Sequence, residues 1–176
     1  TVKTISRAVQ KATTDDIIVV NAGKYKETLT FLDSKIITAK SAGTVVIEGA
    51  ILIAKAAVVT FENVTIQPTT QIFVEGQLIL KNCVIQGGLS NVLIAMNGGT
   101  AHCEKTHFRD ASDIGITLIS DSEAHFEYCH FERNEKVHLL VENSTVHLEN
   151  CELSKGNQAI WAKSKSNAFL NNVKVH

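Results

Sequence analysis

A short pattern of apolar and polar positions recurs along most of the chain. It runs apolar, polar, polar, apolar, polar, apolar, and its copies are FENVTI (61–66), LKNCVI (80–85), CEKTHF (103–108), FEYCHF (126–131), LENCEL (148–153) and LNNVKV (170–175). Successive copies are about 22 residues apart and rich in apolar and β-branched side chains. Such a repeat is typical of a solenoid, in which each repeat forms one coil and the coils stack.

Each copy predicts two short strands on either side of a tight bend. In the first copy Phe61, Val64 and Ile66 would point inward, with the bend at residues 62–63. Asn occupies the second bend position in most copies, and Asn tolerates the left-handed backbone conformation that such a bend requires. A third strand per coil is predicted by QIFVEG, NVLIAM, GITLIS, VHLLVE and AIWAKS. The expected fold is an all-β parallel β-helix of about seven coils with three strands each.

The beginning of the chain predicts a short helix over 3–12. From Ile5 onward, apolar residues recur at i, i+3, i+4 and i+7, and Thr4 is a suitable N-cap. The apolar side of this helix must cover something. We expect it to cover the first coil, because a bare terminal coil is an exposed sheet edge.

The whole chain is expected to form one domain over 1–176. Irregular first coils are predicted over 17–57 and regular coils over 58–175. The last repeat strand ends at His176 without a second helix to cover it. We therefore expect that either the protein continues beyond this residue or a partner covers that end, and the alternative is a frayed but soluble end.

The charge and apolar content narrow the possible partners. The chain has 17 Lys and Arg against 18 Asp and Glu, so no basic surface for nucleic acid or for anionic membranes is expected. No apolar run approaches the roughly 18 residues that a membrane-spanning helix needs. We predict neither a nucleic-acid partner nor a membrane.

The four Cys occupy apolar positions of the repeat. Cys83, Cys129 and Cys151 share one position, and Cys103 takes the position of Phe61. We expect reduced, buried thiols that act as small apolar side chains, which favours a cytoplasmic location. The chain begins without Met, so a processed and secreted form stays open as the alternative.

The first 49 residues contain a characteristic order of segments. TISRAV, DIIVVNAGKYKETLTF and TVVIEG follow one another, with a Gly-x-Tyr-x-Glu turn at Gly23, Tyr25 and Glu27. This order resembles the beginning of pectin methylesterases and related carbohydrate-active proteins of the pectin lyase-like superfamily. The resemblance implies a right-handed β-helix whose third-strand sheet is the substrate-binding face.

The catalytic segments of these relatives are missing from the sequence. The Gly-Gln-Ala and Asp-Phe-Ile-Phe-Gly segments of pectin methylesterases do not occur. Asp15–Asp16 precede the first strand, unlike the paired Asp of polygalacturonases. Arg109, Asp110 and Asp113 lie in one loop, and no acids from adjacent coils join them as in the calcium site of pectate lyases.

The loops that follow the second strand of each coil are short. They are predicted at Gln67–Thr70, Gln86–Ser90, Arg109–Asp113, Glu132–Lys136 and Ser154–Asn157. Loops of this length do not wall a cleft or exclude water. We therefore favour a binding surface over an enzyme, and predict no catalytic residue and no cofactor.

The third strands suggest a binding stripe on the outside of the coils. Aligning them superimposes Phe73, Ile94, Thr117, Leu140 and Trp161. If their neighbours point inward, these residues form an outer apolar stripe that suits a glycan or a protein interface. A register error of one residue would instead place them in the core.

A His-x-Glu motif recurs on three consecutive coils. It comprises His102 and Glu104, His125 and Glu127, and His147 and Glu149. Outward His side chains would stack at the strand spacing of about 4.8 Å, with the Glu side chains alongside. Imidazole and carboxylate are ordinary zinc ligands, so these residues are candidate metal ligands. We favour instead an exterior whose charges offset one another and respond mildly to pH, with the metal site as the weaker hypothesis. Asp121 and Glu123 are interpreted as solvated turn residues.

Together these features favour a non-catalytic recognition module. It would bind a protein partner, or a second copy, along an open face or at its C-terminal end. The alternative is a carbohydrate-binding or polysaccharide-modifying domain, for which a polysaccharide is the partner. A structural segment of a larger chain is a third hypothesis.

Overall fold

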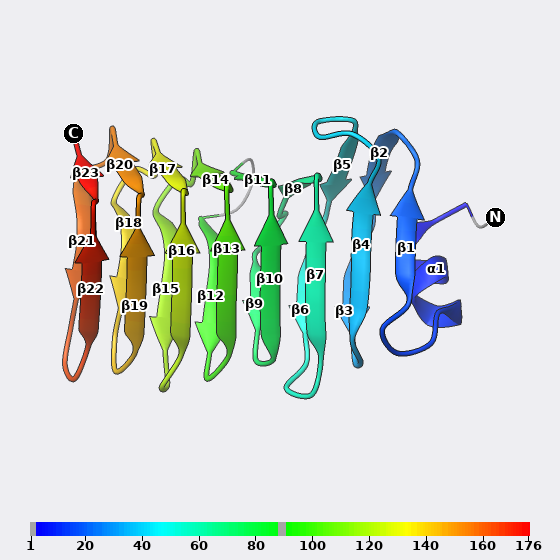
Figure 1. The fold of residues 1–176 in the computed structure, drawn as a ribbon, viewed down its shortest axis with the longest axis horizontal. Coiled ribbons are helices and arrows are strands. Elements are labelled where there is room, and N and C mark those ends of the chain that lie inside the picture. Colours follow the sequence, from blue (N-terminus) through cyan, green and yellow to red (C-terminus); the bar gives the residue numbers. More distant parts are fainter. Residues whose placement is uncertain (1–2, 88–90) are drawn as a thin grey trace.

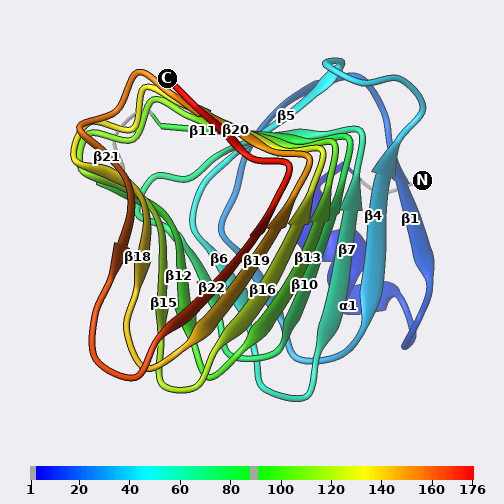
Figure 2. The same cartoon turned by 60° about the vertical axis from the view of Figure 1, so that its left-hand side comes forward.

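The computed structural model describes residues 3–87 and 91–176. Its strands form a right-handed parallel β-solenoid of about seven coils. Figure 1 shows the coils stacked side by side, and Figure 2 shows how each coil turns through three sheets. The predicted β-helix is therefore confirmed. In the described residues no helix is long and apolar enough to cross a membrane.

Each coil contributes one strand to each of three parallel sheets, which we name A, B and C. Sheet A contains β1 (Ile17–Val20), β4 (Lys35–Ala39), β7 (Val58–Glu62), β10 (Gln77–Lys81), β13 (Thr100–Glu104), β16 (Glu123–Glu127), β19 (Thr145–Glu149) and β22 (Asn167–Asn171). Sheet B contains β2 (Gly23–Lys26), β5 (Val45–Glu48), β8 (Thr65–Gln67), β11 (Val84–Gln86), β14 (His107–Arg109), β17 (His130–Glu132), β20 (Glu152–Ser154) and β23 (Lys174–Val175). Sheet C contains β3 (Leu29–Phe31), β6 (Ile51–Ile53), β9 (Ile72–Val74), β12 (Val92–Asn97), β15 (Ile114–Ile119), β18 (Val137–Val141) and β21 (Gln158–Ala162).

The core lies between the three sheets and follows the alternation of the repeat. Phe61, Val64 and Ile66 are buried as predicted, and Phe108, Phe126 and Phe131 pack ring against ring farther along the stack. All four Cys are buried and free, and burial raises the pKa of Cys83 to about 11. Buried thiols fill space like other apolar side chains.

The bend between sheets A and B has a left-handed residue in every regular coil. Asn63, Asn82, Lys105, Tyr128, Asn150 and Asn172 all have a positive φ. The Asn side chains also bond from coil to coil, since Asn82 Nδ2 donates to Asn63 Oδ1 at 2.8 Å and Asn172 Nδ2 to Asn150 Oδ1 at 2.6 Å. The bend therefore both turns the chain and links neighbouring coils.

A buried polar group marks the corner between sheets B and C. Asn134 is fully buried, and its Oδ1 accepts from the backbone N–H of Ala111 at 3.1 Å. Its Nδ2 donates to the Phe108 carbonyl at 3.2 Å and to His138 Nδ1 at 2.9 Å. Burial lowers the pKa of His138, so its ring is neutral at pH 7. Asn134 lies in the predicted Glu132–Lys136 loop, and the sequence does not predict its burial.

Helix α1 (Ile5–Lys11) lies against the first coil (Figure 1). Ile5 is buried in the core, and the Thr4 hydroxyl accepts from the N–H of Arg7 as an N-cap. Glu27 adds a second cap, since its two carboxylate oxygens accept from the N–H groups of Ile5 at 2.9 Å and Ser6 at 2.8 Å. The Gly-x-Tyr-x-Glu turn thus fixes the helix to the coil stack.

The pKa of Glu27 makes this cap sensitive to pH. Burial by itself would raise the pKa of Glu27, but the hydrogen bonds from Ser6 and Ile5 outweigh it and lower the pKa below its usual value. A carboxyl with a lowered folded pKa stabilises the fold fully above its unfolded pKa. That contribution is lost as the pH falls through the folded pKa.

We expect Glu27→Gln to lower the free energy of unfolding by about 1–2 kcal/mol at pH 7, because the helix loses its charged cap. The difference from the unaltered protein should begin to shrink below the unfolded pKa of about 4.3 and should vanish only below the lowered folded pKa, where both proteins carry an uncharged side chain. Urea unfolding at several pH values measures both effects. The exposed Glu135→Gln is the control. Equal stability of the Glu27→Gln protein at pH 7 would contradict the role of the cap.

Candidate functional site

The outer face of sheet C contains a column of side chains in register. Phe73, Ala95, Thr117, Leu140 and Trp161 pair strand by strand from β9 to β21. We call these five residues the outer column. Four of them agree with the predicted stripe, but Ile94 does not. Ile94 is buried and pairs with the inward Ile72 and Ile116, so the prediction was wrong by one residue in β12.

The outer column ends at the most exposed of its side chains. Trp161 is 43% exposed, whereas Phe73, Thr117 and Leu140 are half-buried. The Nζ of Lys163 lies 4.4 Å from the centroid of the Trp161 ring and also 3.8 Å from Glu142 Oε2. This geometry is a cation–π contact, with the Lys163 ammonium over the ring of a partly exposed Trp161.

The connections between sheets B and C beside this face are short, as predicted. Residues 68–71, 110–113, 133–136 and 155–157 join the strands that the structure describes, whereas residues 88–90 of the predicted Gln86–Ser90 loop lie outside the described residues. The face of sheet C is therefore bordered by tight corners.

Charged side chains at these corners pair from coil to coil. Arg133 Nε lies 2.7 Å from Asp110 Oδ1, and Arg133 also contacts Glu132 at 2.7 Å. Asp113 pairs with Lys136 at 3.0 Å, and Arg109 donates to Gln86 Oε1 at 2.9 Å. The Arg and Asp residues of the 109–113 loop thus have partners in neighbouring coils.

The outer face of sheet A holds the predicted His column. His102, His125 and His147 pair strand by strand on β13, β16 and β19. The ring centroids of His102 and His125 are 6.1 Å apart, and those of His125 and His147 are 4.2 Å apart with the planes 3° from parallel. Phe169 on β22 continues the column, with its ring centroid 4.7 Å from that of His147.

The Glu residues of the His-x-Glu motifs are in register but form other contacts. Glu104, Glu127 and Glu149 pair strand by strand, as predicted. Glu104 Oε1 lies 2.7 Å from Lys105 Nζ, and Glu149 Oε1 accepts from Asn171 Nδ2 at 3.3 Å. The structure therefore brings the imidazoles together, but not with these three carboxylates.

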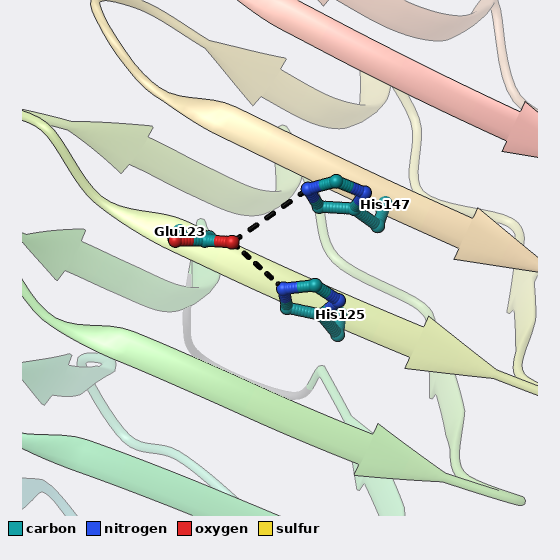
Figure 3. A group of neighbouring side chains, drawn as sticks. All are labelled: Glu123, His125 and His147. Carbon is teal, nitrogen blue, oxygen red and sulfur yellow. Dashed lines mark hydrogen bonds and ion pairs between the residues drawn. The ribbon is translucent and has the colours of Figure 1, made fainter.

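Glu123 supplies the carboxylate that faces the imidazoles instead. Its Oε1 lies 2.8 Å from His125 Nε2 and 3.6 Å from His147 Nε2 (Figure 3). One ligand atom from each of these three residues lies within 4.8 Å of the others, the only such group with metal-ligand chemistry in residues 3–87 and 91–176. Glu123 begins β16 and is not a turn residue, so its interpretation as a solvated turn was wrong.

The sequence contained a signal for this contact. Glu123 and His125 are two residues apart, and residues i and i+2 of a strand lie on the same face. The predicted metal ligands were the Glu residues two positions after each His, whereas the carboxylate that faces the imidazoles belongs to Glu123, two positions before His125.

Comparison with known proteins agrees with this architecture. A family model described as a right-handed beta helix region matches residues 16–175. The chain belongs to the right-handed β-helix family. No curated protein matches this β-helix chain.

A crystal structure of pectate lyase Pel9A is similar to this β-helix with a TM-score of 0.66 and 15% sequence identity. The match covers 85% of this chain and 48% of that one, so the chain spans about half the length of the lyase. At this identity the likeness demonstrates a shared fold. The right-handed parallel β-helix that the family resemblance implied is confirmed.

Proposed function

We propose that this β-helix domain binds an acidic polysaccharide along the outer face of sheet C. The observation that carries the proposal is the outer column, which ends in an exposed Trp161 with Lys163 beside its ring. An exposed aromatic face stacks on the apolar face of a sugar ring, and a neighbouring ammonium group pairs with a carboxylate. The fold shared with a pectate lyase supports the same class of ligand.

The stacking of the coils suits a linear polymer. In-register parallel strands place the residues of the outer column about 4.8 Å apart, so an extended chain lying along the stack meets one side chain of the column at each strand. Because the corners between sheets B and C are short, they do not block a polysaccharide that is longer than the site. The proposal assigns binding to this face and no catalytic residue.

Titration with oligogalacturonates tests the proposal directly. Trp161 is the single Trp of the chain, so a saturable change in its fluorescence is expected as the sugar covers the ring. By calorimetry, Trp161→Ala should weaken binding at least about tenfold, which is about 1.4 kcal/mol. Lys163→Gln should weaken binding of the acidic oligosaccharide but not of a neutral one of equal length.

The control is Phe169→Ala, which removes an exposed aromatic ring from sheet A. It should leave oligosaccharide binding unchanged. If Trp161→Ala binds as tightly as the unaltered protein, the outer column is not the polysaccharide site. If no acidic oligosaccharide binds and self-association depends on Trp161, the predicted protein interface is favoured instead.

A further inference from the structure

We propose that Glu123, His125 and His147 form a binding site for a divalent transition-metal ion, with Zn²⁺ as the expected ion. The site lies on the outer face of sheet A and is independent of the polysaccharide face on sheet C. Its three ligands come from two adjacent strands, β16 and β19 (Figure 3).

The backbone places the three ligands together. Glu123 and His125 lie on the same face of β16, and His147 is the strand partner of His125. The two imidazole rings are almost parallel, and both Nε2 atoms face the same Glu123 oxygen at 2.8 and 3.6 Å. Strand register rather than loop conformation therefore sets the position of the site.

The distances are close to those of a bound zinc ion. Zinc bonds to imidazole nitrogen and to carboxylate oxygen are about 2.0–2.2 Å, so tetrahedral ligand atoms lie about 3.3 Å apart. The three ligand atoms lie within 4.8 Å of one another before any ion binds. The side chains of Glu123, His125 and His147 are 50%, 43% and 34% exposed, so they have room to rotate until the two imidazole nitrogens point at one ion.

The ligand types select the class of metal. Two imidazole nitrogens suit zinc, copper and nickel, whereas calcium and magnesium prefer sites composed of oxygen atoms. Among the described residues, the ion pairs of Glu123 are with His125 and His147 rather than with Lys or Arg. An incoming cation therefore has no fixed ammonium or guanidinium group to displace.

The surroundings hold the rings in place and leave one side open. Phe169 stacks on His147, with the ring planes 11° from parallel, and His102 lies next to His125. These side chains line a groove of about 410 Å³. Three protein ligands leave a fourth tetrahedral position for water or for an oxygen atom of a second ligand.

A second His pair on the same molecule provides the comparison. His107 and His130 on sheet B have ring centroids 4.7 Å apart, but their planes are tilted by 31°. Glu152 lies 3.7 Å from His130 Nε2 and 3.8 Å from His176 Nε2, and its ion pairs among the described residues do not include His107. This pair has stacked imidazoles without a shared carboxylate, so it is expected not to hold the ion.

Calorimetric titration of the metal-stripped, untagged chain with Zn²⁺ tests the site. We expect one equivalent to bind, and His125→Gln, His147→Gln and Glu123→Gln each to weaken binding at least about tenfold. His107→Gln is the matched control and should leave the affinity unchanged. As a second readout, Zn²⁺ should raise the unfolding temperature of the unaltered protein but not that of the His147→Gln protein.

Three results would overturn the proposal. The first is the absence of saturable binding of one Zn²⁺, and the second is unaltered affinity in the His147→Gln protein. The third is Ca²⁺ binding as tightly as Zn²⁺, because two imidazoles should discriminate against calcium. Unfolding curves without metal should coincide for all variants, since the substituted side chains are on the outer face, and Glu123→Gln keeps the size of its side chain.

Discussion

Phe131→Ala is expected to lower the free energy of unfolding by about 3–5 kcal/mol, one of the two largest effects that we predict. Phe131 is fully buried, stacked on Phe108 at 4.9 Å between ring centroids and edge-on to Phe126 at 5.2 Å. Removing the ring leaves a cavity. The surrounding strands cannot move in to fill it, because their hydrogen-bonded register fixes their positions. Chemical denaturation monitored by circular dichroism measures the loss.

The matched control for this change is Phe169→Ala. Its ring is 56% exposed on sheet A, so its removal should cost far less than the removal of Phe131. If the two alanine variants are equally stable, the aromatic cluster does not hold the coils together. The expected order follows from burial, because both changes remove the same side chain.

Asn134→Leu is expected to cost about 3 kcal/mol or more, because a single side chain satisfies several buried groups. The change leaves the buried N–H of Ala111 without its acceptor and removes the donor to His138 Nδ1. Leucine has a similar volume, so lost hydrogen bonds rather than lost packing should dominate. Urea unfolding at neutral pH, where His138 is uncharged, measures the effect.

The exposed Asn157→Leu in the next coil is the control for Asn134. It should change the free energy of unfolding by no more than about 0.5 kcal/mol. An Asn134→Leu protein that is as stable as the Asn157→Leu protein would contradict the role of the buried amide. Protection of the Ala111 amide from hydrogen exchange should be lost in the Asn134→Leu protein, which identifies the affected bond.

The sequence predicted the features that depend on local alternation. Inward residues such as Phe61 and Val64, and left-handed bends such as Asn63, follow from the repeat itself. Ile94 could not be placed correctly because the spacing between third strands varies from coil to coil. A shift of one residue exchanges the inner and outer faces of a strand, and only the hydrogen-bonded register fixes Ala95 in the outer column.

The polar contacts could not be derived from the repeat. Asn134 is next to charged residues that are typical of a solvated loop, and its burial depends on how the coils on either side cover it. Glu123 lies at the start of a strand, where the sequence does not distinguish a turn from a sheet. The family resemblance places Glu27 in a Gly-x-Tyr-x-Glu turn. The hydrogen bonds that its carboxylate accepts from the helix depend on tertiary structure and could not be predicted from the turn.

The one-to-one pairing of coils has a consequence for how the molecule loses its structure. Each coil contacts only the coils before and after it, so cooperativity passes along a single dimension. A defect at the coil that contains Asn134 would therefore act as a boundary, with the coils on either side melting as separate units. Native-state exchange would then report two blocks of protection instead of one.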